Sequence, residues 1–130
     1  MRCVIALDTT LRLLAERARP PHALVAPTLL RSEVLSALRA AAGRGEIGRR
    51  EADARLDHFR ALKPRLLGDR VLQRKAWDMA DRLGWPDTGP AEYPALTLLQ
   101  ADAFVTLDHS VARQLDGIVP IVSYEALLRT

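Results

Sequence analysis

Two aspartates follow directly after short apolar runs of the sequence. Asp8 follows the run CVIAL, and Asp108 follows the run AFVTL. Apolar runs of this length predict buried strands, and in an open parallel sheet ligands bind beyond the carboxyl ends of the strands. We therefore expect Asp8 and Asp108 at the same edge of a sheet, where their carboxylates are available for chemistry. The alternative is that each carboxylate caps the helix that follows it.

Glu33 is the third acidic candidate, because it lies within the apolar stripe of a predicted helix. A carboxylate there needs a partner, either a metal ion or an arginine such as Arg31. The alternative is a solvated glutamate in the first turn, favoured by the helix dipole. Carboxylates that meet at one point repel each other unless a cation neutralises them, and oxygen ligands favour Mg²⁺ or Mn²⁺. The three acids therefore predict metal-assisted cleavage of phosphodiester bonds.

Strands and helices alternate along the sequence. Strands are predicted at residues 3–7, 22–26, 63–67, 103–107 and 118–122, the third of them at a sheet edge. Helices are predicted at residues 11–18, 28–43, 49–62, 69–83, 91–100, 110–115 and 124–128, with Asp69 as one N-cap and Gly84 ending that helix. This order predicts an α/β fold: one three-layer α/β/α domain over residues 1–130, with a central, mostly parallel sheet of four or five strands.

The composition is typical of one globular domain in the cytoplasm. The 130 residues are 48% apolar and 27% charged. Cys3 is the only cysteine, which excludes an intrachain disulfide and suits a reducing compartment. No apolar run has the length of a membrane helix or the form of a signal peptide. The net charge of +3 comes almost entirely from arginine, which permits nucleic-acid binding without requiring it.

Three stretches of the sequence together resemble the PIN-domain family, and specifically the VapC-type toxins of bacterial toxin–antitoxin pairs. They are IALDTTLRLLA, APTLLRSEVLSALRAA and AEYPALTLLQADAFVTLDHSVA, and the resemblance covers the whole chain. It implies a Mg²⁺- or Mn²⁺-dependent endoribonuclease with Asp8, Glu33 and Asp108 as metal ligands. Thr10 and Thr106 correspond to hydroxyls near the metal site, although Thr10 could equally be a helix cap.

The resemblance fails at one metal ligand, because family members usually carry an aspartate where this sequence has Pro90. Glu92 and Asp87 are the two available replacements. Glu92 is preferred, because a helix that begins near Ala91 or Glu92 would leave Pro94 in its first turn and turn Glu92 toward the metals. The alternatives are a surface role for Glu92 and a capping role for Asp87.

The resemblance also implies partners: an RNA substrate, an antitoxin protein and a second copy of the chain. In the family, the helices after Glu33 form a dimer and antitoxin groove, which would make Leu56 and Phe59 contact residues. Core packing explains Leu56 and Phe59 equally well. The mixed charges of residues 44–60 predict a solvated helix face with ion pairs four residues apart.

Two other functions compete with the nuclease. A degenerate PIN domain would bind RNA or an antitoxin-like partner and cleave little, because Pro90 has replaced a ligand; restoring the acid with Pro90→Asp should then raise activity. A receiver-like regulatory domain would use a strand-end aspartate as phosphoacceptor. It needs a lysine at a strand end, and Lys63 and Lys75 are poorly placed for that role.

Overall fold

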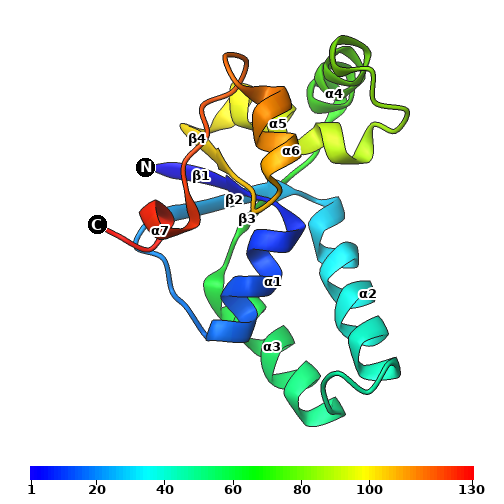
Figure 1. Cartoon of the computed structure of the whole chain (residues 1–130), viewed down its shortest axis with the longest axis vertical. Helices are drawn as coiled ribbons and strands as arrows, with labels where there is room; N and C mark the ends of the chain where they lie inside the picture. The colour runs from blue at the N-terminus through cyan, green and yellow to red at the C-terminus, as the bar shows by residue number, and fades with distance from the viewer.

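A sheet of four parallel strands forms the centre of the fold (Figure 1). The computed structural model describes residues 1–130. The strands lie side by side in the order β3-β2-β1-β4, and β1 pairs with both β2 and β4, so that Cys3 lies opposite Leu24 and Ala103. Their bounds are β1 (Arg2–Ile5), β2 (Ala23–Pro27), β3 (Arg65–Leu67) and β4 (Ala103–Val105). The predicted edge position of β3 is confirmed.

Helices cover both faces of the sheet. In Figure 1, α1, α2 and α3 lie below the sheet and α4 and α5 lie above it, with α5 packed against β1, β2 and β4. This arrangement confirms the predicted three-layer α/β/α fold. The bounds are α1 (Leu7–Glu16), α2 (Leu29–Gly43), α3 (Arg49–Leu62), α4 (Arg70–Leu83), α5 (Gly89–Gln100), α6 (His109–Leu115) and α7 (Tyr124–Leu127).

Helix α4 has the ends that the sequence predicts, because both ends carry local signals. The side chain of Asp69 accepts a hydrogen bond from the Leu72 N–H at 2.8 Å, which satisfies one free donor of the first turn. Gly84 ends the helix with a φ of 70°, a conformation that glycine adopts without steric cost. The predicted bounds of α3 are confirmed as well.

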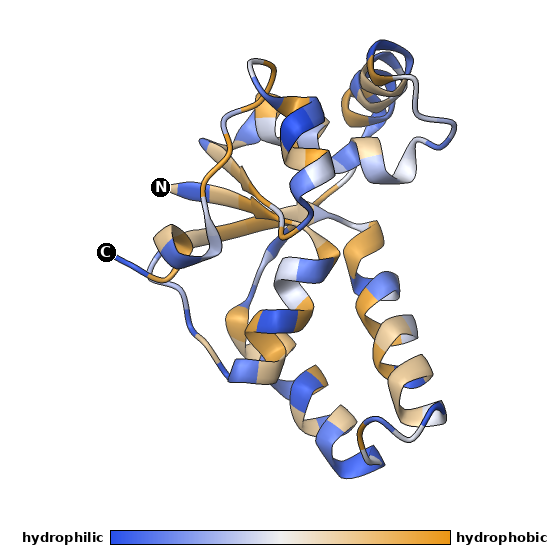
Figure 2. Cartoon of the chain, viewed as in Figure 1, coloured by the Kyte–Doolittle hydropathy of each residue, from blue (hydrophilic) through white to orange (hydrophobic).

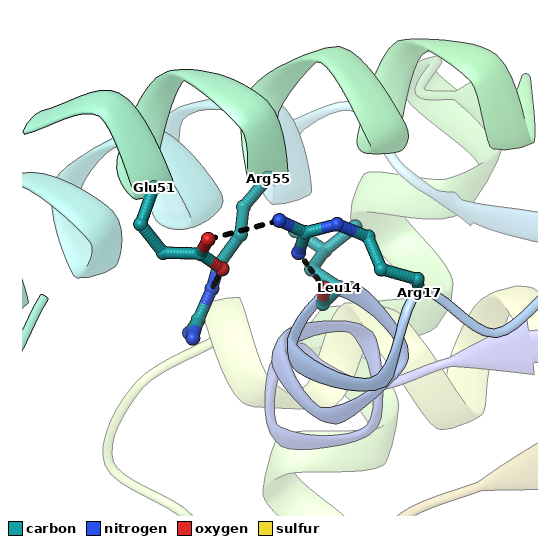
Figure 3. Close-up of polar contacts among 4 residues, drawn as sticks. All are labelled: Leu14, Arg17, Glu51 and Arg55. Carbon is teal, nitrogen blue, oxygen red and sulfur yellow. Dashed lines mark hydrogen bonds and ion pairs between the residues drawn. The ribbon is translucent and has the colours of Figure 1, made fainter.

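A chain of polar contacts joins α1 to α3 (Figure 3). Arg17, at the C-cap of α1, donates to the Leu14 carbonyl at 2.8 Å and to the Glu51 carboxylate at 3.0 Å. Glu51 also accepts from Arg55 at 2.7 Å, one turn further along α3. The charged face of α3 predicted from residues 44–60 is thus confirmed. Exposed pairs of this kind contribute little to stability, and of the two ion pairs only Arg17–Glu51 joins α1 to α3.

Helix α1 begins earlier than the sequence predicts. Its N-cap is Ala6, and the Thr10 N–H donates to the Ala6 carbonyl at 2.9 Å. Threonines fit inside this turn because both hydroxyls donate to backbone carbonyls: Thr9 to Val105 at 2.9 Å and Thr10 to Ala6 at 2.8 Å. Asp8 therefore lies within the first turn of the helix, where the helix dipole favours an acid, and does not precede the helix.

The predicted strand at residues 118–122 does not form. This segment makes an isolated parallel bridge between Ile121 and Phe104. The Phe104 N–H donates to the Pro120 carbonyl at 2.9 Å, and the Val122 N–H donates to the Phe104 carbonyl at 3.1 Å. Pro120 has no N–H with which to extend the ladder, so the sheet has four strands and not five.

Apolar side chains of the strands and the helices form one core. Figure 2 shows the strands mostly in orange, whereas the helices alternate between orange and blue. Val4 and Ile5 of β1 and Val105 of β4 are fully buried. Cys3 is also fully buried and forms no disulfide. No helix in the chain is both long enough and apolar enough to cross a membrane.

Candidate functional site

Asp8 lies between the start of α1 and the residues that follow β4. One carboxylate oxygen, Oδ1, accepts hydrogen bonds from the Thr9 N–H at 2.6 Å and from the Leu107 N–H at 3.3 Å. The other, Oδ2, accepts from the Thr106 hydroxyl at 3.5 Å. Because β1 and β4 are neighbours, these contacts hold Asp8 at the carboxyl edge of the sheet, where the sequence predicts it.

Asp108 lies at the same edge as the N-cap of α6. Its Oδ1 accepts from the Ser110 N–H at 2.9 Å and from the Val111 N–H at 3.1 Å, so the capping role considered as an alternative is present. The Asp108 N–H donates to the hydroxyl of Thr106 at 3.2 Å, the same hydroxyl that contacts Asp8. The Thr106 hydroxyl thus contacts the carboxylate of Asp8 and the backbone of Asp108, and its role near a metal stays a prediction.

Glu33, on α2, contacts a residue that sequence reasoning did not single out. Its Oε1 accepts a hydrogen bond from the hydroxyl of Tyr93, on α5. Arg31 forms no ion pair with Glu33, so an arginine partner is not confirmed. Tyr93 is only 5% exposed, and its ring packs against Phe104 with centroids 6.3 Å apart.

Helix α5 begins at Gly89, which corrects the predicted start near Ala91 or Glu92. The Glu92 N–H donates to the Thr88 carbonyl at 3.0 Å, so the helix is already formed two residues earlier than expected. Pro94 consequently lies inside the helix and leaves the carbonyl of Pro90, four residues before it, without its usual donor. Pro90 itself is an exposed residue.

The side chain of Glu92 nevertheless shares the electrostatic environment of Glu33. Burial raises the pKa of Glu92 above its ordinary value, and the negative charge of Glu33 raises it further. The pKa of Tyr93 is raised strongly, first by burial, then by its hydrogen bond to Glu33, and then by the charges of Glu33, Glu92 and Asp8. Asp8, Glu33 and Glu92, which we call the carboxylate cluster, thus come from three different helices, and their charges all act on one buried phenol.

Two predicted near-site residues lie outside this cluster. The hydroxyl of Thr10 is buried and occupied by the Ala6 carbonyl one turn earlier, so it is a backbone partner within α1 and not a group that faces a metal. Asp87 is exposed in the loop before α5 and makes no hydrogen bond or ion pair. Of the two candidates for replacing the aspartate that the family usually has at position 90, only Glu92 lies within the influence of the charge of Glu33.

Sequence reasoning also missed Thr9, although its neighbours were considered. Thr9 is fully buried, and its hydroxyl donates to the Val105 carbonyl at 2.9 Å, which fixes the first turn of α1 to the end of β4. Two features of the sequence could have drawn attention to Tyr93. It is one of only two tyrosines in a chain with few aromatic residues, and it directly follows Glu92.

The chemistry of the carboxylate cluster suits a divalent cation, since its donors are all oxygen atoms and no Lys, Arg or His pairs with them. The six ion pairs of the chain involve none of Asp8, Glu33, Glu92 and Asp108. The carboxylates stand apart from one another, however, and no three His, Cys, Asp or Glu residues are placed to hold one metal ion. The donor atoms are therefore of the kind that Mg²⁺ or Mn²⁺ prefers.

A cavity of about 480 Å³ lies beside the helices that follow Glu33. Leu35 is 56% exposed at this groove, whereas Phe59 is buried at 7% exposure and also belongs to the core. Phe59 therefore belongs to the core and also lines the groove, and its contact with a partner stays a prediction. The lining contains three basic residues and no acidic one: Arg31, Ser32, Leu35, Leu56, Phe59, Arg60, Lys63, Pro64 and Leu66.

Large apolar side chains are exposed on the opposite layer. Trp77 on α4 is 64% exposed and Val71 on the same helix is 59% exposed. Leu98 and Leu99, near the end of α5, are 42% and 38% exposed. Helices α4 and α5 pack against each other, and Val71 and Leu99 line the same hollow between them. We call the four exposed apolar side chains of these two helices the α4–α5 patch.

The sequence matches no protein-family model and no curated protein. Its fold is similar to the crystal structure of PAE2754 from Pyrobaculum aerophilum, with a TM-score of 0.73 and 20% sequence identity. The match covers 98% of this chain and 93% of that chain. At this level of identity the likeness establishes the fold alone: the protein belongs to the three-layer α/β class with a parallel sheet.

Proposed function

We propose that this protein is a metal-dependent endoribonuclease that hydrolyses RNA phosphodiester bonds as the toxin of a toxin–antitoxin pair. The observation that supports this most is the carboxylate cluster: Glu33 accepts the hydrogen bond of the buried Tyr93, the charges of Asp8 and Glu92 also act on Tyr93, and none of the three acids pairs with a basic side chain. Such a cluster calls for a cation, and oxygen donors suit Mg²⁺ or Mn²⁺. The substrate class rests on the resemblance of the sequence to PIN-domain toxins.

In this proposal, Asp8, Glu33 and Glu92 hold the cation, and Asp108 contributes the oxygen that its capping role leaves free. The bound cation would lower the pKa of a water molecule and stabilise charge on the phosphate. The chain's own contribution is to hold its carboxylates in place. Asp8 is fixed by the Leu107 N–H, so it needs little reorganisation to bind a cation.

A second candidate function is favoured by one observation, the separation of the carboxylates. Because no three acids are placed to hold one ion, the chain could bind RNA or an antitoxin-like partner with little cleavage. The exposed Pro90, in place of the family's aspartate, supports the same interpretation. The two functions differ in whether metal-dependent cleavage is measured.

The groove beside α2 and α3 supports an antitoxin partner. Its lining combines apolar side chains such as Leu35 with the basic residues Arg31, Arg60 and Lys63. Arg60 pairs with Asp57 at 2.7 Å, whereas Arg31 and Lys63 form no ion pair. Charge complementarity therefore favours an amphipathic segment that places apolar side chains on Leu35 and acidic side chains beside Arg31 and Lys63. An RNA substrate and a toxin role would place this activity in the cytoplasm.

The α4–α5 patch supports the second proposed partner, another copy of the chain. Exposed apolar side chains that lie close together on packed helices mark protein interfaces more often than isolated ones do. Trp77 is the most exposed of them and the residue type most enriched at the centre of interfaces. In a symmetric dimer this patch would meet its own copy.

Cleavage of a labelled single-stranded RNA tests the proposed function. Wild-type protein should cleave it with Mn²⁺ or Mg²⁺ and not with a chelator. Asp8→Asn should lower the rate by about 100-fold or more, because a cluster oxygen loses its charge. Asp81→Asn is the matched control, because Asp81 is exposed on α4 and its carboxylate makes no hydrogen bond or ion pair.

Cleavage that survives in pure Asp8→Asn protein, or that is insensitive to chelation, would exclude the metal-dependent nuclease. Wild-type protein that binds the RNA and never cleaves it would favour the second candidate. In that case Asp8→Asn should leave the affinity for RNA unchanged, because Asp8 would serve no bound metal.

A further inference from the structure

The hydroxyl of Tyr93 is the one side-chain donor that contacts Glu33. Tyr93 comes from α5 and Glu33 from α2, sixty residues apart in the sequence. The ring is buried and already packed against Phe104, so a phenylalanine would fill the same space. The hydroxyl is therefore not needed for packing, and its contact with Glu33 is what distinguishes tyrosine from phenylalanine here.

The other tyrosine of the chain makes the same kind of bond in a different setting. Tyr124 donates to Glu16 at 2.7 Å, but Glu16 also pairs with Arg12 at 3.1 Å. The guanidinium of Arg12 additionally lies 4.1 Å above the Tyr124 ring. Glu16 is thus neutralised by its surroundings, and Tyr124 is part of a structural contact between α1 and α7.

Glu33 lacks such a counter-charge. Its Oε1 is occupied by Tyr93, its Oε2 has no hydrogen-bond partner in the chain, and no basic side chain pairs with it. Its negative charge raises the pKa of Glu92, and the charges of Glu33, Glu92 and Asp8 all raise the pKa of Tyr93. The neutral hydroxyl of Tyr93 can orient the Glu33 carboxylate without neutralising its negative charge, so that this charge stays available to a cation.

We propose that Tyr93 is a positioning residue, whose hydroxyl holds Oε1 of Glu33 and leaves Oε2 as the oxygen offered to a divalent cation. This inference rests on the proposed function and assigns α5 two contributions to the site, the charge of Glu92 and the donor of Tyr93. Hydrogen bonds to ligating carboxylates orient them, and losing one typically weakens metal binding about 10–100-fold.

Mn²⁺ affinity, measured by isothermal titration calorimetry on the full chain, tests the proposal with Tyr93→Phe and the control Tyr124→Phe. Both variants lose one tyrosine–glutamate hydrogen bond, so both should lower the metal-free Tm by a few degrees. Tyr93→Phe alone should raise the Kd for Mn²⁺ by about 10–100-fold. In a Glu33→Gln background, Tyr93→Phe should have no further effect on the Kd, because Tyr93 acts through Glu33.

Each outcome decides between the inference and the proposed function. If wild-type protein binds Mn²⁺ and Tyr93→Phe binds it equally well or more tightly, the positioning role is wrong and the metal site stands. An equal loss of affinity in Tyr124→Phe would also overturn the positioning role, because the effect would then be one of general stability. If wild-type protein binds no Mn²⁺, the proposed function fails and this inference fails with it.

Discussion

Asp108 allows a capping role and a ligand role to be separated at one position. Its Oδ1 accepts the N–H groups of Ser110 and Val111 at the start of α6, while no bond occupies Oδ2. Asp108→Ala removes both the cap and the charge. Asp108→Asn keeps a capping oxygen and removes only the charge, because asparagine caps helices as well as aspartate does.

The expected size of the effect follows from the cap. Loss of an N-cap to alanine costs about 1 kcal/mol. With an unfolding entropy of about 2.1 cal/mol/K per residue, a chain of 130 residues has about 0.27 kcal/mol/K. Asp108→Ala should therefore lower the Tm by about 4 °C, and Asp108→Asn by about 1 °C or less.

Differential scanning calorimetry in the presence of a chelator measures both shifts. Ser123→Ala is the matched control, since the Ser123 hydroxyl caps α7 by accepting the Ala126 N–H at 3.0 Å. Ser123→Ala should resemble Asp108→Ala in Tm and wild type in RNA cleavage. Asp108→Asn should show the reverse pattern, a nearly native Tm with reduced cleavage. An equal fall of the Tm in Asp108→Asn and Asp108→Ala would refute the reasoning, because it would mean that charge and not capping stabilises α6.

Three further predictions concern the cluster and the two surfaces. Without metal, Glu92→Gln should raise the Tm at about pH 7 and leave it unchanged at about pH 4. The control Glu125→Gln should leave the Tm unchanged at both pH values. Folding raises the pKa of Glu92 above its ordinary 4.5, so its carboxylate destabilises the fold only once the pH exceeds that value; an equal gain at low pH would contradict this. Trp77→Ala should shift a wild-type dimer toward monomer in sedimentation equilibrium, and a monomeric wild type would exclude the α4–α5 contact. Leu35→Ala should weaken binding of an acidic amphipathic helical peptide in fluorescence anisotropy, because it removes an apolar contact and leaves the charge of the groove unchanged; unchanged binding would exclude the groove as the binding site.

The sequence predicted those elements whose ends carry a chemical signal of their own. Asp69 and Gly84 define α4 because a capping carboxylate and a left-handed glycine are local features. The strand edge that holds Asp8 and Asp108 was predictable as well, because parallel strands place their carboxyl ends together. The three-layer order follows from the alternation of the elements.

Other features depend on contacts that no local pattern records. Helix α1 was predicted four residues too late because Thr9 and Thr10 resemble a cap, and only the Val105 and Ala6 carbonyls make them suitable inside a helix. The bond between Tyr93 and Glu33 joins α5 to α2 and has no signature in either segment. The roles of the acids as metal ligands stay predictions.

The early start of α5 has a consequence for position 90, where the family that the sequence resembles usually carries an aspartate. In a helix that begins at Gly89, position 90 and Glu92 are separated by about 200° of rotation and about 3 Å of rise. Pro90 is exposed, whereas Glu92 is partly buried within reach of the charge of Glu33. An aspartate introduced by Pro90→Asp would therefore extend toward solvent and away from Glu33.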